Sequence, residues 1–137
     1  MSGKPTSVVD LVWLGDLKFA AKTGRSTSTL DSSGTAGFSP VETLAAALAG
    51  CMSTDVVYIL TRGHHPLKAL ASHFAAERAL KDPRRIVSAT LHFTITGDVP
   101  PDAVDRAITL SREKYCSVWH SMRQDIDLQV SWGRDSG

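Results

Sequence analysis

The sequence predicts an α+β fold in which antiparallel strands are combined with two main helices. Several short segments alternate apolar and polar residues, as strands do, whereas one long segment, residues 39–63, repeats apolar residues at helical spacing. The predicted order is three strands, a helix, two strands, a helix and a strand. This order lacks the repeated βαβ units that build a parallel sheet.

The first three strands are expected before residue 31. Residues 8–14 and 17–22 are apolar runs separated by a Gly-Asp pair, which is typical of a hairpin turn. A short third strand is expected at residues 26–30. Residues 31–38 are rich in Gly, Ser and Thr without periodicity, and this composition predicts a loop.

The long helix has clear start and stop signals. Ser39 suits the N-cap, Pro40 the first helical position, and Glu42 completes a capping box, while Gly63 marks the end. The spacing predicts one shared face, formed by Leu44, Ala47, Leu48, Cys51, Asp55, Tyr58 and Ile59. A helix of about 22 residues that is apolar almost all round needs more cover than so small a chain offers, which favours a dimer.

The second half continues with a hairpin, a helix and a final strand. Residues 67–80 and 84–96 flank a Lys-Asp-Pro turn, and the second arm alternates apolar and polar residues. Residues 102–115 are expected to form the second helix, followed by a short helical turn. Residues 126–132 alternate again and predict the last strand.

Bulk composition limits the class of protein. A chain of 137 residues, 42% of them hydrophobic, fits one domain spanning residues 1–137. With 15 basic and 14 acidic residues, no net field attracts nucleic acid or an anionic membrane. No run of about 18 uncharged apolar residues and no signal-peptide pattern is evident, so a cytoplasmic location is expected. In a reducing compartment, two cysteines indicate redox chemistry or metal binding more than a structural disulfide.

The two cysteines have different surroundings. Cys51 lies among small residues of the apolar helix, where a cysteine is either a buried packing residue or a thiol with room for a substrate. Cys116 lies where the second helix should end, and the negative end of a helix dipole disfavours a thiolate. Cys116 is therefore expected to be the poorer attacking thiol and the better resolving one.

A metal site is not expected from the sequence. The cysteines are far apart and form no CxxC pair, which leaves only histidines as further ligands. These histidines are scattered over turns and strands without ligand spacing: His64, His65, His73, His92 and His120. We predict neither a metal ion nor a cofactor.

Two motifs resemble the OsmC-like family, which includes the organic hydroperoxide resistance enzymes. The first is the helix 39–63, with its SPxE start, AAALAGC centre and DVVYIL continuation; the second is KYCSV at residues 114–118. The predicted order of elements is similar across nearly the whole chain. The resemblance implies an OsmC-like fold, built as an intertwined homodimer with active sites at the interface.

The resemblance also implies a cysteine-based peroxidase active in oxidative stress defence. In that family the first cysteine attacks a peroxide and becomes a sulfenic acid, which the second cysteine converts to a disulfide. Carried over, Cys51 is the peroxidatic residue and Cys116 the resolving one. A small peroxide and a dithiol reductant are then the expected partners, and recycling by thiol exchange fits this chemistry.

The residues that activate the cysteine depart from the family pattern. Val41 follows Pro40 where the family has a glutamate, and Glu42 comes one place later; Lys18 and Arg25 are the candidates to replace the family arginine. Because Glu42 precedes Cys51 by about 13.5 Å of helical rise, the two side chains of one chain cannot meet. Glu42 is thus either a helix cap or a catalytic residue that acts across a dimer axis.

Two functions stay open at this level. One is a peroxidase for organic hydroperoxides. The other is a non-catalytic protein that binds an apolar small molecule at the dimer interface and uses its cysteines for packing. Asp55, one turn after Cys51, would raise the pKa of a nearby thiol unless a lysine or arginine were paired with it.

Overall fold

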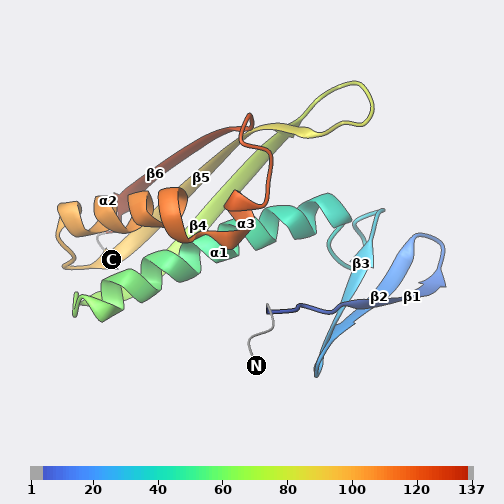
Figure 1. Cartoon of the computed structure of the whole chain (residues 1–137), viewed down its shortest axis with the longest axis horizontal. Coiled ribbons are helices and arrows are strands. Elements are labelled where there is room, and N and C mark those ends of the chain that lie inside the picture. Colours follow the sequence, from blue (N-terminus) through green and yellow to red (C-terminus); the bar gives the residue numbers. More distant parts are fainter. Residues whose placement is uncertain (1–4, 136–137) are drawn as a thin grey trace. The chain divides into compact units, whose positions relative to one another are not determined.

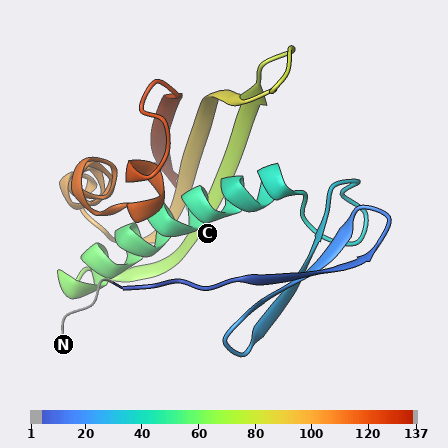
Figure 2. The ribbon, with the colours of Figure 1, turned by 45° about the vertical axis from the view of Figure 1, so that its right-hand side comes forward.

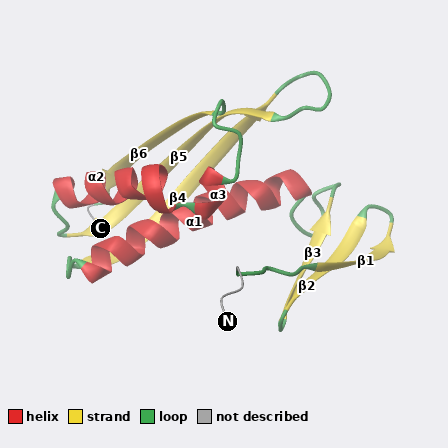
Figure 3. Cartoon of the chain, viewed as in Figure 1, coloured by secondary structure: helices red, strands yellow, loops and turns green. Residues whose placement is uncertain are grey.

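The computed structural model describes residues 5–135, and it confirms the α+β fold and the predicted order of elements (Figures 1 and 3). The chain divides into two compact units, with the boundary after Leu44. The first unit contains a three-stranded sheet. The second contains another three-stranded sheet and most of the helical residues. The organisation as one domain stays a prediction.

The first unit is an antiparallel meander. Its strands are β1 (Asp10–Gly15), β2 (Lys18–Thr23) and β3 (Ser26–Asp31), in that spatial order. The turn between β1 and β2 places Gly15 and Asp16 at positive φ, which explains the Gly-Asp pair in the sequence. The predicted hairpin and third strand are therefore confirmed.

Helix α1 (Pro40–Arg62) begins with the predicted capping box. The Glu42 N–H donates to Ser39 Oγ at 3.1 Å, and the Ser39 N–H donates to Glu42 Oε1 at 2.9 Å. The predicted buried face was only partly right. The fully buried row is Leu48, Met52, Val56 and Leu60, whereas Cys51 and Asp55 are half-buried and Leu44 and Tyr58 are exposed. In a helix that is apolar almost all round, spacing alone does not select the stripe that meets the core.

The second unit is built on a mixed sheet. Strand β4 (Leu67–Arg78) pairs antiparallel with β5 (Ile86–Gly97), and β5 pairs in parallel with β6 (Asp127–Arg134). The parallel pairing differs from the expected all-antiparallel arrangement. The helical segment between β5 and β6 acts as a crossover that returns the chain to start β6 in the same direction as β5.

Helices cover one face of this sheet, as Figures 1 and 2 show for α2 (Pro101–Leu110), α3 (Ser117–His120) and the part of α1 in this unit. The predicted second helix is in fact two pieces, because α2 changes at residue 111 into the π-helical turn η1 (Ser111–Tyr115). The alternation predicted for β5 is confirmed by its buried residues, Ala89, Leu91, Phe93 and Ile95.

Among the described helices, α1 is long and apolar enough to cross a membrane by length and composition alone, with a mean hydropathy of 1.6 in its most apolar window. The core helix of a globular protein meets the same criterion. Here α1 is attached to the sheet, since Ser53 Oγ lies 2.6 Å from Ser72 Oγ of β4, and its buried row contributes to the core.

Candidate functional site: a thiol pair with a carboxylate

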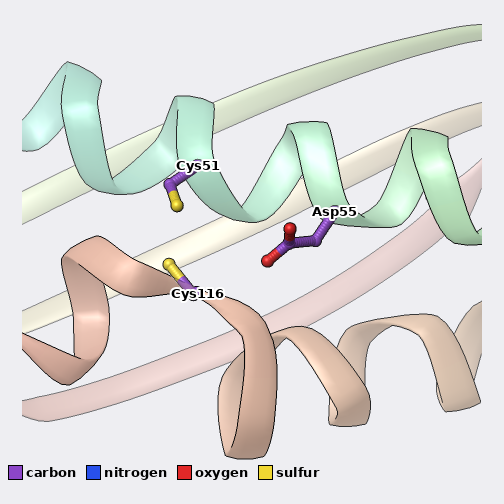
Figure 4. Close-up of side chains that lie close together, drawn as sticks. All are labelled: Cys51, Asp55 and Cys116. Atoms are coloured by element: carbon purple, nitrogen blue, oxygen red, sulfur yellow. The ribbon is translucent and has the colours of Figure 1, made fainter. Parts of the chain in front are cut away.

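The fold brings together the two cysteines that are far apart in the sequence. Cys51 lies midway along α1, and Cys116 lies between η1 and α3. Their sulfur atoms and a carboxylate oxygen of Asp55 all lie within 4.8 Å of one another. Figure 4 shows Cys51 and Asp55 projecting from the same side of α1 toward Cys116. Both cysteines are free thiols.

Backbone hydrogen bonds hold Cys116 in place. Its N–H donates to the Ser111 carbonyl at 2.8 Å, which closes the π-helical turn. Its sulfur accepts a hydrogen bond from the Trp119 N–H at 3.4 Å, so the thiol caps the start of α3. The π-helical turn and this cap fix the sulfur of a fully buried residue against α1.

The two thiols differ in their environment. The pKa of Cys116 is raised from 9.0 to about 11, mainly by burial and also by Cys51 and Asp55, whereas the hydrogen bond from the Trp119 N–H lowers it. Cys116 is therefore a protonated thiol at neutral pH. Cys51 is half-buried and is the more accessible of the two.

The hydrogen-bond partner of Asp55 is a hydroxyl group, not a lysine or arginine. Ser111 Oγ donates to Asp55 Oδ2 at 2.8 Å, and Ser111 itself is fully buried. Within residues 5–135, no lysine or arginine forms an ion pair with this carboxylate. The carboxylate is thus held in position by a neutral group, one turn after Cys51 on the same helix.

A pocket of about 430 Å³ adjoins the thiol pair, because Asp55 is part of its wall. The pocket has aromatic, aliphatic and charged walls of both signs, formed by Asp55, Tyr58, Ile59, Arg62, Arg106, Leu110 and Tyr115. The Arg62 guanidinium lies 5.7 Å from the ring centre of Tyr58, a cation–π contact that orients it. Such a mixture suits an organic molecule with a polar end.

The other predicted catalytic residues belong to the first unit. Glu42 caps α1, Lys18 Nζ lies 3.9 Å from Asp16, and Arg25 is exposed in the turn between β2 and β3. Both cysteines belong to the second unit. A catalytic role for Glu42, Lys18 or Arg25 stays a prediction.

The sequence placed Asp55 near Cys51 but did not predict that it lies close to Cys116 or that Ser111 binds it. The four-residue spacing between Cys51 and Asp55 was the available signal, because it puts both on one helical face. Ser111 had no such signal, since its approach to Asp55 depends on how α2 and η1 pack against α1. In the described part of the chain, Cys51, Asp55 and Cys116 are the one group of three or more side chains that could ligate a metal ion together.

Comparisons with known proteins identify the family of the chain. The family model described as "OsmC-like protein" matches residues 31–131. The curated Protein YhfA of Escherichia coli K12 is 33% identical over 123 residues, which cover 88% of this chain and 92% of that protein.

Two solved structures extend the comparison. A hypothetical protein from Aquifex aeolicus is 26% identical, with a TM-score of 0.89 and coverage of 96% of this chain and 98% of its own. A protein from Legionella pneumophila, described as an organic hydroperoxide resistance protein OsmC, is 16% identical, with a TM-score of 0.71 and coverage of 96% and 99%. At 16% identity, the similarity to the Legionella pneumophila protein shows the fold alone.

Proposed function

The chain belongs to the OsmC-like family, and from this premise we propose that it is a thiol-dependent peroxidase that reduces organic hydroperoxides. The observation that carries the proposal is the closeness of the two thiols, within 4.8 Å, on separate elements of the fold. A disulfide bond requires a sulfur separation of about 2.05 Å, so a modest approach of the two side chains suffices to form one.

Cys51 is proposed as the attacking residue because it is the more accessible thiol. Its thiolate attacks the terminal peroxide oxygen, the O–O bond breaks, and the products are a sulfenic acid on Cys51 and an alkoxide that takes up a proton to become the alcohol. The buried Cys116, with its raised pKa, is less suited to this first step.

Cys116 is proposed as the resolving residue. Its sulfur attacks the sulfenic sulfur of Cys51, a disulfide forms, and the hydroxyl of the sulfenic acid leaves as water with the thiol proton. A dithiol reductant then restores both thiols by exchange and becomes a disulfide itself. The close approach of Cys116 protects the sulfenic acid from further oxidation.

The adjoining pocket is proposed to hold the organic group of the peroxide. Ile59 and Leu110 supply apolar contacts, and Asp55 connects this space with the thiols. An alkyl or aryl hydroperoxide has more to bury in such a pocket than hydrogen peroxide has. We therefore expect organic hydroperoxides to be consumed faster than hydrogen peroxide.

We further propose a cytoplasmic homodimer. Large apolar side chains of the first unit are between 38% and 64% exposed: Val8, Val9, Leu11, Val12, Trp13, Leu14, Leu17, Phe19 and Phe38. An exposed apolar surface of this kind marks an interaction site, and a second copy is the partner that the family suggests.

The proposed interface is tested by sedimentation of two variants. Trp13→Asp is expected to be a monomer, whereas Leu80→Asp, at a position 95% exposed in the hairpin of the second unit, should stay dimeric. A Trp13→Asp variant that stays dimeric would contradict the proposal that this surface forms the dimer interface.

The activity is tested with reduced protein and cumene hydroperoxide, following peroxide loss and protein mass. Cys51→Ser is expected to abolish consumption, and Cys116→Ser to allow one turnover that leaves a trappable sulfenic acid on Cys51. Peroxide consumption that survives in Cys51→Ser would refute the proposal. Unmodified thiols in the wild-type protein under excess peroxide would instead favour the non-catalytic role, in which the pocket binds an apolar ligand.

A further inference from the structure

We propose that the reduced thiol pair and Asp55 form a binding site for one thiophilic metal ion of the zinc class, with its open coordination position facing the adjoining pocket. The sequence argued against a metal because no ligand spacing is visible along the chain. The tertiary structure supplies the missing proximity, since two ligands come from α1 and the third from the start of α3.

The ligand set suits such an ion. Two cysteine sulfurs and one carboxylate oxygen are all ligands that zinc accepts, at bond lengths of about 2.3 Å to sulfur and about 2.0–2.2 Å to oxygen. In a tetrahedral site these lengths separate ligand atoms by about 3.5–3.8 Å. The three atoms here already lie within 4.8 Å of one another, so a contraction of about 1 Å completes three corners of the tetrahedron.

Hydrogen bonds from neighbouring groups hold two of the three ligands, Asp55 and Cys116, in place. Ser111 Oγ donates to one oxygen of Asp55, which fixes the carboxylate and leaves its other oxygen available. The Trp119 N–H donates to the sulfur of Cys116. Groups that orient ligands in this way contribute substantially to metal affinity. Cys51 and Asp55, spaced one turn apart on a continuous helix, have a fixed relative orientation.

Three protein ligands leave a fourth position open. Of the three ligand residues, Asp55 also lines the pocket of about 430 Å³, and we infer that water or a small ligand enters the open position from that side. An open position distinguishes this arrangement from the closed four-ligand sites that serve structure alone. The buried position of Cys116 and the half-buried positions of Cys51 and Asp55 shield the other three corners from solvent.

Metal binding and disulfide formation exclude each other, because both use the same two sulfurs. Binding of the divalent ion displaces the two thiol protons. If the proposed peroxidase activity holds, one hydroperoxide and two protons then convert the metal-bound pair into a disulfide, an alcohol, water and the free ion. The oxidation of the metal-bound pair rests on the proposed function, whereas metal binding itself does not.

The test uses the full chain, reduced and freed of metal under anaerobic conditions, titrated with Co²⁺ as a spectroscopic substitute for zinc. We expect one equivalent to bind with the strong near-ultraviolet absorption of thiolate-to-cobalt charge transfer, and Zn²⁺ to displace it. Cys51→Ser and Cys116→Ser should each lose most of this band. Asp55→Asn should weaken Co²⁺ binding by at least about 10-fold, and Ser111→Ala by about 10- to 100-fold, the usual effect of removing a group that orients a ligand.

A matched control is Glu113→Gln, which removes an exposed carboxylate from the same turn as Ser111 and should leave the titration unchanged. Absence of the charge-transfer band at stoichiometric Co²⁺ would overturn the proposal. So would a band that needs both cysteines but is the same in Asp55→Asn, because the carboxylate would then be no ligand. No peroxide is used, so failure here is distinct from failure of the peroxidase assay.

Discussion

The titration of Cys116 provides the sharpest check on the environment of the thiol pair. Its pKa is raised from 9.0 to about 11, first by burial and then by the hydrogen bond and charge of Cys51 and by the charge of Asp55. At pH 9.0 about 1% of Cys116 is therefore thiolate, compared with half of an ordinary cysteine. Removing Cys51 should lower this pKa while leaving it above 9.0, because burial remains.

Nuclear magnetic resonance of protein labelled with ¹³C at the cysteine Cβ measures this directly. The chain has two cysteines, so the wild type gives two resonances, and Cys51→Ala identifies the one from Cys116. The experiment is done with reduced protein and a chelator to keep metal ions away. A Cys116 midpoint at or below 9.0 in the wild type would refute the assigned environment, as would a midpoint that rises in Cys51→Ala.

The same shift predicts how stability depends on pH. Folding raises the pKa of Cys116, so the folded state favours its protonated form. The resulting stabilisation is fully present below pH 9.0, the ordinary value, and is lost as the pH rises through about 11. Urea denaturation between these values should show a steeper loss of stability in the wild type than in Cys116→Ser. Equal slopes would contradict this linkage.

Three further predictions concern packing, capping and acid stability. Leu91→Ala should lower the free energy of unfolding by about 2–5 kcal/mol through the cavity it leaves, while Leu80→Ala, at an exposed position, should change it by less than about 0.5 kcal/mol; urea denaturation compares them. Glu42→Gln should keep the start of α1 and the rate of peroxide consumption, since glutamine can accept the same Ser39 N–H; a slower rate at unchanged stability would assign the Glu42 charge to the chemistry. The hydrogen bond from the Ser33 hydroxyl is the main cause that holds the pKa of Asp31 well below its ordinary 3.8. The stabilisation of the fold by ionised Asp31 is therefore present above pH 3.8 and is lost as the pH falls below that value. Acid denaturation of Asp31→Asn should show a weaker pH dependence in that range, and an unchanged profile would count against it.

Local signals in the sequence predicted the elements well where they act over a few residues. The capping box at Ser39 and Glu42 fixed the start of α1, and the alternation in residues 84–96 predicted the buried face of β5. These features depend on hydrogen bonds and side-chain directions between near neighbours. They therefore follow from the sequence without knowledge of the tertiary structure.

Features that depend on packing between distant segments were harder to predict from the sequence. The buried stripe of α1 was misplaced because its surface is apolar on nearly every side, and the parallel pairing of β6 depends on where the crossover delivers the chain. The π-helical turn at residues 111–115 interrupts a segment whose pattern continues that of a helix. No local pattern of polar and apolar residues encodes these outcomes.

The thiol site, too, has a part that the sequence determined and a part that only the tertiary structure decided. The sequence by itself determined the α+β class, the order of elements and, through its two cysteine motifs, the resemblance to the OsmC-like family. Only the tertiary structure decided that Asp55 lies close to both Cys51 and Cys116 and that Ser111 holds its carboxylate. The physical reason is that motifs reflect local chemistry, whereas a cluster of atoms within 4.8 Å depends on how α1 packs against η1 and α3.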